Sequence, residues 1–153
     1  MTDILHDFVI KAPRAQVFQA IATPEGLDRW WTLRSSGRAE LGATWELYFG
    51  EPHDWRAVVT RCRAGEAFER VRDRLVSAEL GLTRADAEWS GTSVRFTLAE
   101  HDDLTALRFA HVGWPSSSAH CRTSSYCWAM YLRLLRRWLE LGETVPYALR
   151  LDA

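Results

Sequence analysis

The chain has 153 residues, of which 47% are hydrophobic and 25% are charged, so its composition is that of an ordinary globular protein with enough length for one core. The formal net charge is −1 and the arginines are scattered, which argues against nucleic-acid binding and against attraction to an anionic membrane. No apolar run reaches the roughly 18 residues of a membrane span. The N-terminal residues include early acids and no cationic stretch, so we expect no signal peptide.

Cysteine and metal-ligand patterns are sparse. The three cysteines, Cys62, Cys121 and Cys127, are odd in number and show no C-x-x-C spacing, which argues against a disulfide framework or a zinc site. The sequence contains no H-E-x-x-H motif and no Gly-rich phosphate loop. We therefore expect no metal and no cofactor, and a reducing cytoplasm as the location.

The first part of the chain predicts one strand followed by two short helices. Residues 4–10 alternate and the run ends at Pro13, which indicates a β-strand. Residues 13–22 place apolar side chains at helical spacing. Thr23 is suited to cap a second short helix, with Pro24 at its first position.

The middle of the chain changes to a period of two, which is typical of strands with one buried face. Turn residues separate the alternating runs, so we predict an antiparallel meander. The runs are residues 43–49, 55–63, 67–73, 93–100 and 104–113. Residues 74–89 lack a clean period and are compatible with another strand, a helical turn or an exposed loop. We expect the segment 73–88 to be the most mobile part of the chain.

The C-terminal third predicts one long amphipathic helix. Its apolar side chains recur at i, i+3/4 and i+7, its start lies between Ser118 and Ser125, and Gly142 is suited to the position after its end. A sheet with one apolar face needs a cover, and this helix is the only predicted element long enough to provide it. We therefore predict a single α+β domain over residues 1–153.

Eight tryptophans are an unusual number for a chain of this length. Each buries about 150–250 Å² and needs a partner for its indole N–H, so several together predict either a generous core or an aromatic-lined cavity. Trp30 and Trp31 are adjacent, so we expect one ring to pack in the core while the other borders a cavity mouth or is exposed.

Four stretches of the sequence resemble a known family in their order and spacing. They are APRAQVFQAIATPEGLDRWW (12–31), WSGTSVRFTLAE (89–100), FAHVGWP (109–115) and YCWAMYLRLLRRWLELGETVPY (126–147). They are similar to the START-like (SRPBCC) superfamily, in the branch named for activators of the heat-shock protein 90 ATPase (Aha-type, C-terminal-domain-like). The chain departs from the family pattern at residues 72–88 and at Cys127, where glycine often precedes the helix tryptophan.

The resemblance implies a helix-grip (START/Bet v 1-like) fold. In this fold a curved antiparallel sheet, with two short helices after its first strand, wraps around a long C-terminal helix. The superfamily contains lipid and hydrophobic-ligand binders, co-chaperones and cyclases, so the fold does not decide the function.

The candidate site is a cavity between the sheet and the last helix. Spacing places Trp128, Tyr131 and Leu135 on one helix stripe, which forms either solid core or a cavity wall. Alternation places Phe96 and Phe109 on the sheet face opposite. The full set of candidate ligand-binding residues is Trp31, Arg56, Phe96, Phe109, His111, Trp114, Trp128, Tyr131 and Leu135.

Two of these candidates carry polar groups with alternative roles. His111 is on the core-facing side of its strand and could make a structural hydrogen bond, contact a ligand or act as a general acid or base. Arg56 faces solvent or, in the other register, the cavity, where it would pair with a ligand carboxylate. No nucleophile motif such as G-x-S-x-G accompanies His111, so we name no catalytic residue.

Three functions remain open from the sequence. The leading one is binding of a small hydrophobic molecule, lipid included, in the cavity, by a monomer or a homodimer. The resemblance adds a co-chaperone that stimulates a chaperone ATPase, with a role in stress response, and we expect this activity to be weak or absent. The third is a polyketide cyclase-like or hydrolase-like enzyme that uses His111.

Overall fold

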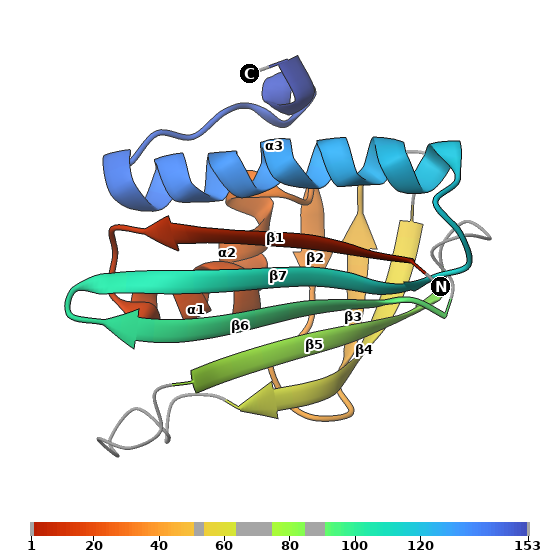
Figure 1. The fold of residues 1–153 in the computed structure, drawn as a ribbon, viewed down its shortest axis with the longest axis horizontal. Coiled ribbons are helices and arrows are strands. Elements are labelled where there is room, and N and C mark those ends of the chain that lie inside the picture. Colours follow the sequence, from red (N-terminus) through yellow and green to blue (C-terminus); the bar gives the residue numbers. More distant parts are fainter. Residues whose placement is uncertain (1, 51–53, 64–74, 85–90, 153) are drawn as a thin grey trace.

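A computed structural model describes residues 2–50, 54–63, 75–84 and 91–152 (Figure 1). They form a seven-stranded antiparallel sheet, three α-helices and a final 3-10 helix. The elements in chain order are β1 (Thr2–Ile10), α1 (Arg14–Ala22), α2 (Pro24–Trp30), β2 (Arg34–Ser36), β3 (Thr44–Tyr48), β4 (Asp54–Arg63), β5 (Leu75–Arg84), β6 (Ser93–His101), β7 (Leu104–Trp114), α3 (Ala119–Leu141) and η2 (Tyr147–Asp152).

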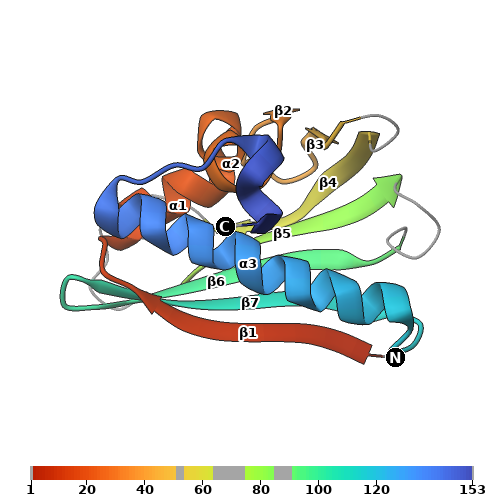
Figure 2. The ribbon, with the colours of Figure 1, turned by 90° about the horizontal axis from the view of Figure 1, so that it is seen from above.

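The sheet has the order β1-β7-β6-β5-β4-β3-β2, so all strands except β1 follow one another as a meander, and β1 adds to the far edge beside β7. Helix α3 lies along one face of this sheet, and Figure 2 shows it from above, crossing the strands at an angle. Helices α1 and α2 contact α3 and also cover this face. The predicted α+β helix-grip architecture is therefore confirmed.

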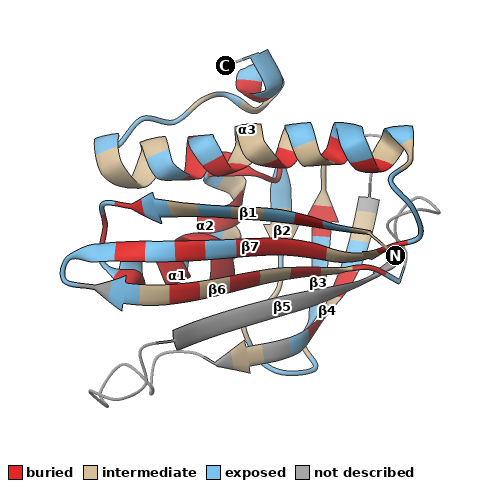
Figure 3. Ribbon diagram, in the orientation of Figure 1, coloured by how far each residue is buried: buried red, intermediate tan, exposed pale blue. Residues whose placement is uncertain are grey.

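Side chains that point toward α3 form the core. Along β6 and β7 the buried residues alternate with more exposed ones, and Phe96 pairs with Phe109 across the two strands. Buried and more exposed residues alternate along the ribbons of β6 and β7 in Figure 3. The period of two thus places the inner face as the sequence predicts.

The two short helices begin and end where the sequence predicts. Thr23 caps α2, because its hydroxyl accepts a hydrogen bond from the Gly26 amide at 3.0 Å. A side chain at Gly26 would lie 2.5 Å from the backbone oxygen of Gln19, so only glycine lets α2 pack this closely against α1.

Helix α3 begins after Ser118, whose hydroxyl accepts from the Cys121 amide, and it ends at Gly142 with a φ of 70°. This is the left-handed conformation in which glycine is favoured.

The structure decides what the sequence left open at one segment, adds two short elements, and leaves one predicted run outside the described residues. The segment left open at 74–89 contains β5, a regular strand paired on both sides, with β4 and with β6. The run at 67–73 lies outside the described residues. The short edge strand β2 and the helix η2 were not predicted. Trp30 and Trp31 are both buried, so neither ring is exposed; α2 ends between them, and Trp31 borders a pocket while Trp30 packs in the core, which is one of the two expected arrangements.

Candidate ligand-binding site

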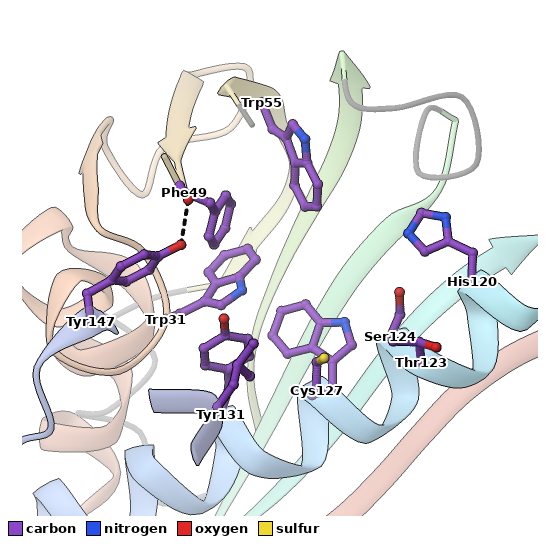
Figure 4. Close-up of a pocket in the computed structure, with 11 residues that line it drawn as sticks. Trp31, Phe49, Trp55, His120, Thr123, Ser124, Cys127, Tyr131 and Tyr147 are labelled. Carbon is purple, nitrogen blue, oxygen red and sulfur yellow. Dashed lines mark hydrogen bonds between the residues drawn. The ribbon is translucent and has the colours of Figure 1, made fainter. Parts of the chain in front are cut away.

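A pocket of about 300 Å³ lies between α3, η2 and the region of the sheet where β3 leads into β4 (Figure 4). Six of its described lining residues are Trp, Phe or Tyr, and most of the others are small and polar. The lining residues are Trp31, Phe49, Trp55, His120, Thr123, Ser124, Cys127, Trp128, Tyr131, Tyr147 and Leu151.

One stripe of α3 forms the floor of the pocket. His120, Ser124, Cys127 and Tyr131 follow one another at intervals of three or four residues, so their side chains share one face of the helix. The first members of this stripe are polar and the last, Tyr131, is a ring. The small side chains of Ser124 and Cys127 leave the space that larger residues would fill.

Rings from the sheet side form the opposite wall. Trp31 follows α2, and its ring centroid lies 5.3 Å from that of Phe49 and 4.9 Å from that of Trp128. Phe49 lies in turn 5.0 Å from Trp55, the second residue of β4. Contacts at these distances are favourable for aromatic pairs, so the wall is a connected cluster.

The C-terminal helix η2 closes one side of the pocket with Tyr147 and Leu151. The buried guanidinium of Arg150 holds η2 in place by donating to three backbone oxygens: Val145 at 3.1 Å, Thr32 at 3.0 Å and Asp28 at 2.6 Å. Burial lowers the Arg150 pKa from its ordinary value.

A second bond ties η2 to the wall opposite. The Tyr147 hydroxyl donates to the Phe49 backbone oxygen at 2.6 Å (Figure 4). Together with the bonds of Arg150, this contact fixes the position of both lining residues of η2.

The turn after α2 is fixed by a carboxylate. Asp28 Oδ1 accepts from the Thr32 hydroxyl at 2.6 Å and from the Ser35 hydroxyl at 2.8 Å. This turn carries Trp31 and offers the Thr32 oxygen to Arg150. The sequence between Asp28 and Ser35 therefore positions both a wall of the pocket and the anchor of η2.

The interior of the pocket disfavours ionised groups. Burial, with Tyr147 and Cys127 nearby, raises the pKa of Tyr131 to about 12, although Arg150 acts in the opposite direction. Burial also raises the pKa of the Cys127 thiol. Both groups are thus neutral near pH 7, and the lining residues that the structure describes include no Asp, Glu, Lys or Arg.

His111 lies behind the pocket and makes a structural pair of hydrogen bonds. The Trp128 indole N–H donates to its Nδ1 at 3.1 Å, so in the neutral ring Nε2 carries the proton and donates to the Thr92 hydroxyl at 2.7 Å. His111 is fully buried. Burial lowers its pKa to about 3, and the nearby His120 adds a smaller effect in the same direction. A neutral ring with both nitrogens bonded and no exposure is unsuited to general acid–base catalysis.

The nine predicted site residues separate into three groups. Trp31, Trp128 and Tyr131 come together at the pocket. The residues Phe96, Phe109, His111, Trp114 and Leu135 are buried in the core next to it and are not among its lining residues. Arg56 lies on the opposite face of the sheet, where it is exposed and 3.9 Å from Glu46 Oε1, because it alternates with the inward Trp55 and Ala57.

Sequence reasoning missed eight of the lining residues. Phe49 and Trp55 lie on predicted inward positions of strands, and the stripe from His120 to Cys127 continues the predicted one by whole turns, so alternation and helical spacing could have found these. Nothing in the local pattern of Tyr147 and Leu151 pointed to the pocket. The missed residues are Phe49, Trp55, His120, Thr123, Ser124, Cys127, Tyr147 and Leu151.

The described residues lack two other kinds of feature. None of their helices has both the length and the apolar character that a bilayer crossing requires. Within the same residues, no three His, Cys, Asp or Glu side chains gather as a metal-ligand group. The three cysteines are free thiols.

Comparisons with known proteins agree on the fold. The family described as "Activator of Hsp90 ATPase homolog 1-like protein" matches residues 11–140. No curated protein matches the chain.

Solved structures match over almost the whole chain. The Aha1 dimer of Colwellia psychrerythraea is 26% identical, with a TM-score of 0.74 over 94% of this chain and 99% of that one. Protein SSP2350 of Staphylococcus saprophyticus is 20% identical, with a TM-score of 0.71 over 94% and 96%. CalU16 of Micromonospora echinospora is 19% identical, with a TM-score of 0.67 over 98% and 81%.

Proposed function

The chain belongs to the Activator of Hsp90 ATPase homolog 1-like family of the START-like (SRPBCC) superfamily, and from that premise we propose that it binds a small hydrophobic molecule between its sheet and α3. The observation that carries the proposal is the ring-lined pocket of about 300 Å³. Pockets of this size, mostly apolar with a few polar groups, are typical of small-molecule sites.

The packing around the pocket supports a site formed before the ligand arrives. Trp31 and Trp128 are held by ring contacts, and Tyr147 by its bond to the Phe49 oxygen. Because these side chains are already ordered, binding does not have to order them, which lowers its entropic cost.

The experiment uses Nile red, a neutral dye that fluoresces in apolar surroundings. Thr123 is exposed at the edge of the pocket, so Thr123→Trp adds an indole that fills the space without disturbing the core. Arg122→Trp is the matched control, because it adds the same ring one position along α3, at an exposed residue that does not line the pocket.

We expect the wild type and Arg122→Trp to bind the dye, and Thr123→Trp to bind it about tenfold more weakly or not at all. Native mass spectrometry of freshly purified protein would identify any molecule retained from the cell. Absence of dye binding by the wild type, or equal binding by all three proteins, would contradict the proposal.

A co-chaperone activity is the second candidate, and the family name and the Colwellia psychrerythraea Aha1 relative favour it. We expect it to be weak, because the near-zero net charge offers no strong docking field for a large ATPase. The test is ATP hydrolysis by a bacterial chaperone of the heat-shock protein 90 type with and without this protein. A several-fold rise in rate that Thr123→Trp leaves unchanged would make the co-chaperone reading the better one.

Location and assembly remain part of the proposal. Three free thiols suit a reducing compartment, so we retain the cytoplasm as the expected location. The Colwellia psychrerythraea relative is described as a dimer, and size-exclusion chromatography with light scattering would decide between a monomer and a homodimer for this chain.

A further inference from the structure

The chemistry of the pocket walls restricts the class of ligand. Ring faces come from four parts of the chain: the end of α2, the β3–β4 region, α3 and η2. Flat aromatic molecules gain both area burial and favourable ring contacts against such walls, whereas a flexible alkyl chain gains only the burial and loses more conformational freedom. The wall composition therefore favours a planar ring system.

Three polar side chains gather at one end of the pocket. His120, Thr123 and Ser124 occupy the first turns of α3, while Tyr131 and Tyr147 lie at the other end (Figure 4). The Tyr147 hydroxyl is already bonded to the Phe49 oxygen. A ligand that carries one polar group would therefore be oriented with that group toward the first turns of α3.

Charge gives the sharpest restriction. The described lining residues contain no Lys or Arg that could pair with a carboxylate or phosphate. The nearby guanidinium of Arg150, 5.4 Å from the centre of the Tyr147 ring, is already bonded to three backbone oxygens.

The pKa of Tyr131 shows that the same environment disfavours an anion. Its pKa of about 12 means that burial disfavours the phenolate even with Arg150 close by. A ligand carboxylate in the same place would lose its hydration in the same way.

From these three observations we propose that the pocket takes a neutral, flat aromatic molecule of a few fused rings, with a hydrogen-bonding group directed at His120, Thr123 and Ser124. This proposal rests on the proposed function and narrows it. The volume of about 300 Å³ lies at the small end of ligand pockets, which suits a molecule of that size.

The experiment compares matched probes by titration calorimetry near neutral pH. Anthracenemethanol, anthracene carboxylate and dodecanoate differ in charge and in flatness. We expect the neutral alcohol to bind about tenfold or more tightly than either anion. Tighter or equal binding of the carboxylate or of dodecanoate would overturn the ligand class while the pocket function stands. Failure of all three probes, together with failure of Nile red, would instead overturn the proposed function itself.

The orientation has its own test. The double variant Thr123→Val, Ser124→Ala removes two hydroxyls from the polar end, and Ser125→Ala is the control, because Ser125 does not line the pocket. The double variant should bind anthracenemethanol about three- to tenfold more weakly than the wild type. Its affinity for methylanthracene, which lacks the hydroxyl, should be unchanged. Equal losses for both probes, or no loss for either, would contradict the orientation.

Discussion

The same kind of side chain has two different fates on the two sides of α3. Under the helix, Phe96 and Phe109 are buried. The ring centroid of Phe109 lies 4.4 Å from that of Trp128 and 5.4 Å from that of Phe96. Toward β3 and β4, Phe49 and Trp55 keep part of their surface exposed and border the pocket.

The difference comes from what faces the rings. Toward Phe96 and Phe109, α3 presents Leu132 and Leu135, which are both buried. Toward the pocket it presents Thr123, Ser124 and Cys127, which are too small to reach the opposite wall. Rings alone therefore do not decide between core and cavity; the size of the side chains opposite them does.

Trp128 belongs to both halves, so its removal should have the largest effect. Its ring contacts Phe109 and Trp31, and its indole N–H donates a hydrogen bond to Nδ1 of His111. Trp128→Ala should lower the free energy of unfolding by about 3–5 kcal/mol and also abolish dye binding. Urea denaturation and Nile red titration measure the two effects. Trp55→Ala, at the half-buried rim, is the comparison and should cost less stability while binding is still lost. A small stability loss for Trp128→Ala would mean that this ring is not part of the packed half.

The histidine behind the pocket should make stability depend on pH. The His111 pKa falls from 6.5 to about 3 on folding, so between these values the unfolded chain binds one more proton than the folded chain. Stability is therefore full above pH 6.5 and falls as the pH drops toward 3, by up to about 1.4 kcal/mol per pH unit.

His111→Gln removes this titration, and the two proteins are compared by denaturant unfolding across that pH range. The wild type should lose more stability than the variant on acidification, because the other groups contribute alike to both. Parallel pH curves would show that His111 is not held neutral in the core.

The core half is where the sequence was most informative, and the reason is physical. Alternation places Val94, Phe96 and Leu98 inward because successive side chains of a strand point to opposite faces. Strand β5 was left open, although its sequence alternates: Val76, Ala78, Leu80 and Leu82 share one phase and Ser77, Glu79, Gly81 and Thr83 the other. The same period of two could have predicted it, and the structure shows it as a strand paired with two neighbours.

The pocket half depended on information that the local pattern does not carry. Trp31 and Tyr131 were placed at a cavity wall in advance, but Tyr147 reaches the pocket through bonds between distant parts of the chain: Arg150 bonds to oxygens 118 and 122 positions earlier, and Tyr147 itself to the Phe49 oxygen. A three-bond anchor to backbone oxygens has no sequence signature, since any residue supplies the acceptor.

Removal of that anchor should affect the pocket half more than the core half. Arg150→Ala leaves three backbone oxygens without their donor and should cost about 1.5–3 kcal/mol of local stability. Hydrogen exchange should rise in η2 and remain unchanged in β6 and β7, and dye affinity should fall because Tyr147 and Leu151 lose their positions. Arg133→Ala, at an exposed position of α3, is the control and should change neither quantity. Unchanged exchange in η2 would contradict the anchoring role.

The smallest expected effect belongs to the single bond between η2 and the wall. Tyr147→Phe deletes the hydroxyl that donates to the Phe49 oxygen at 2.6 Å but retains the ring. We expect the free energy of unfolding to fall by about 0.5–1.5 kcal/mol, measured by thermal unfolding, and the dye affinity to fall modestly, measured by titration. A loss as large as that of Arg150→Ala would mean that this bond, rather than the guanidinium, holds η2.

The central claim is that the space beside α3, and no other part of the described structure, receives the ligand. The eight indole N–H signals of the nitrogen-15-labelled protein test it most directly, when a neutral probe such as naphthalenemethanol is titrated in. The indoles of Trp31, Trp55 and Trp128 line the pocket and should shift, whereas Trp45, bonded to the Arg38 oxygen, and Trp138, near the far end of α3, should not. Shifts at Trp45 or Trp138 with none at the three pocket indoles, or no shifts at saturating probe, would contradict the account.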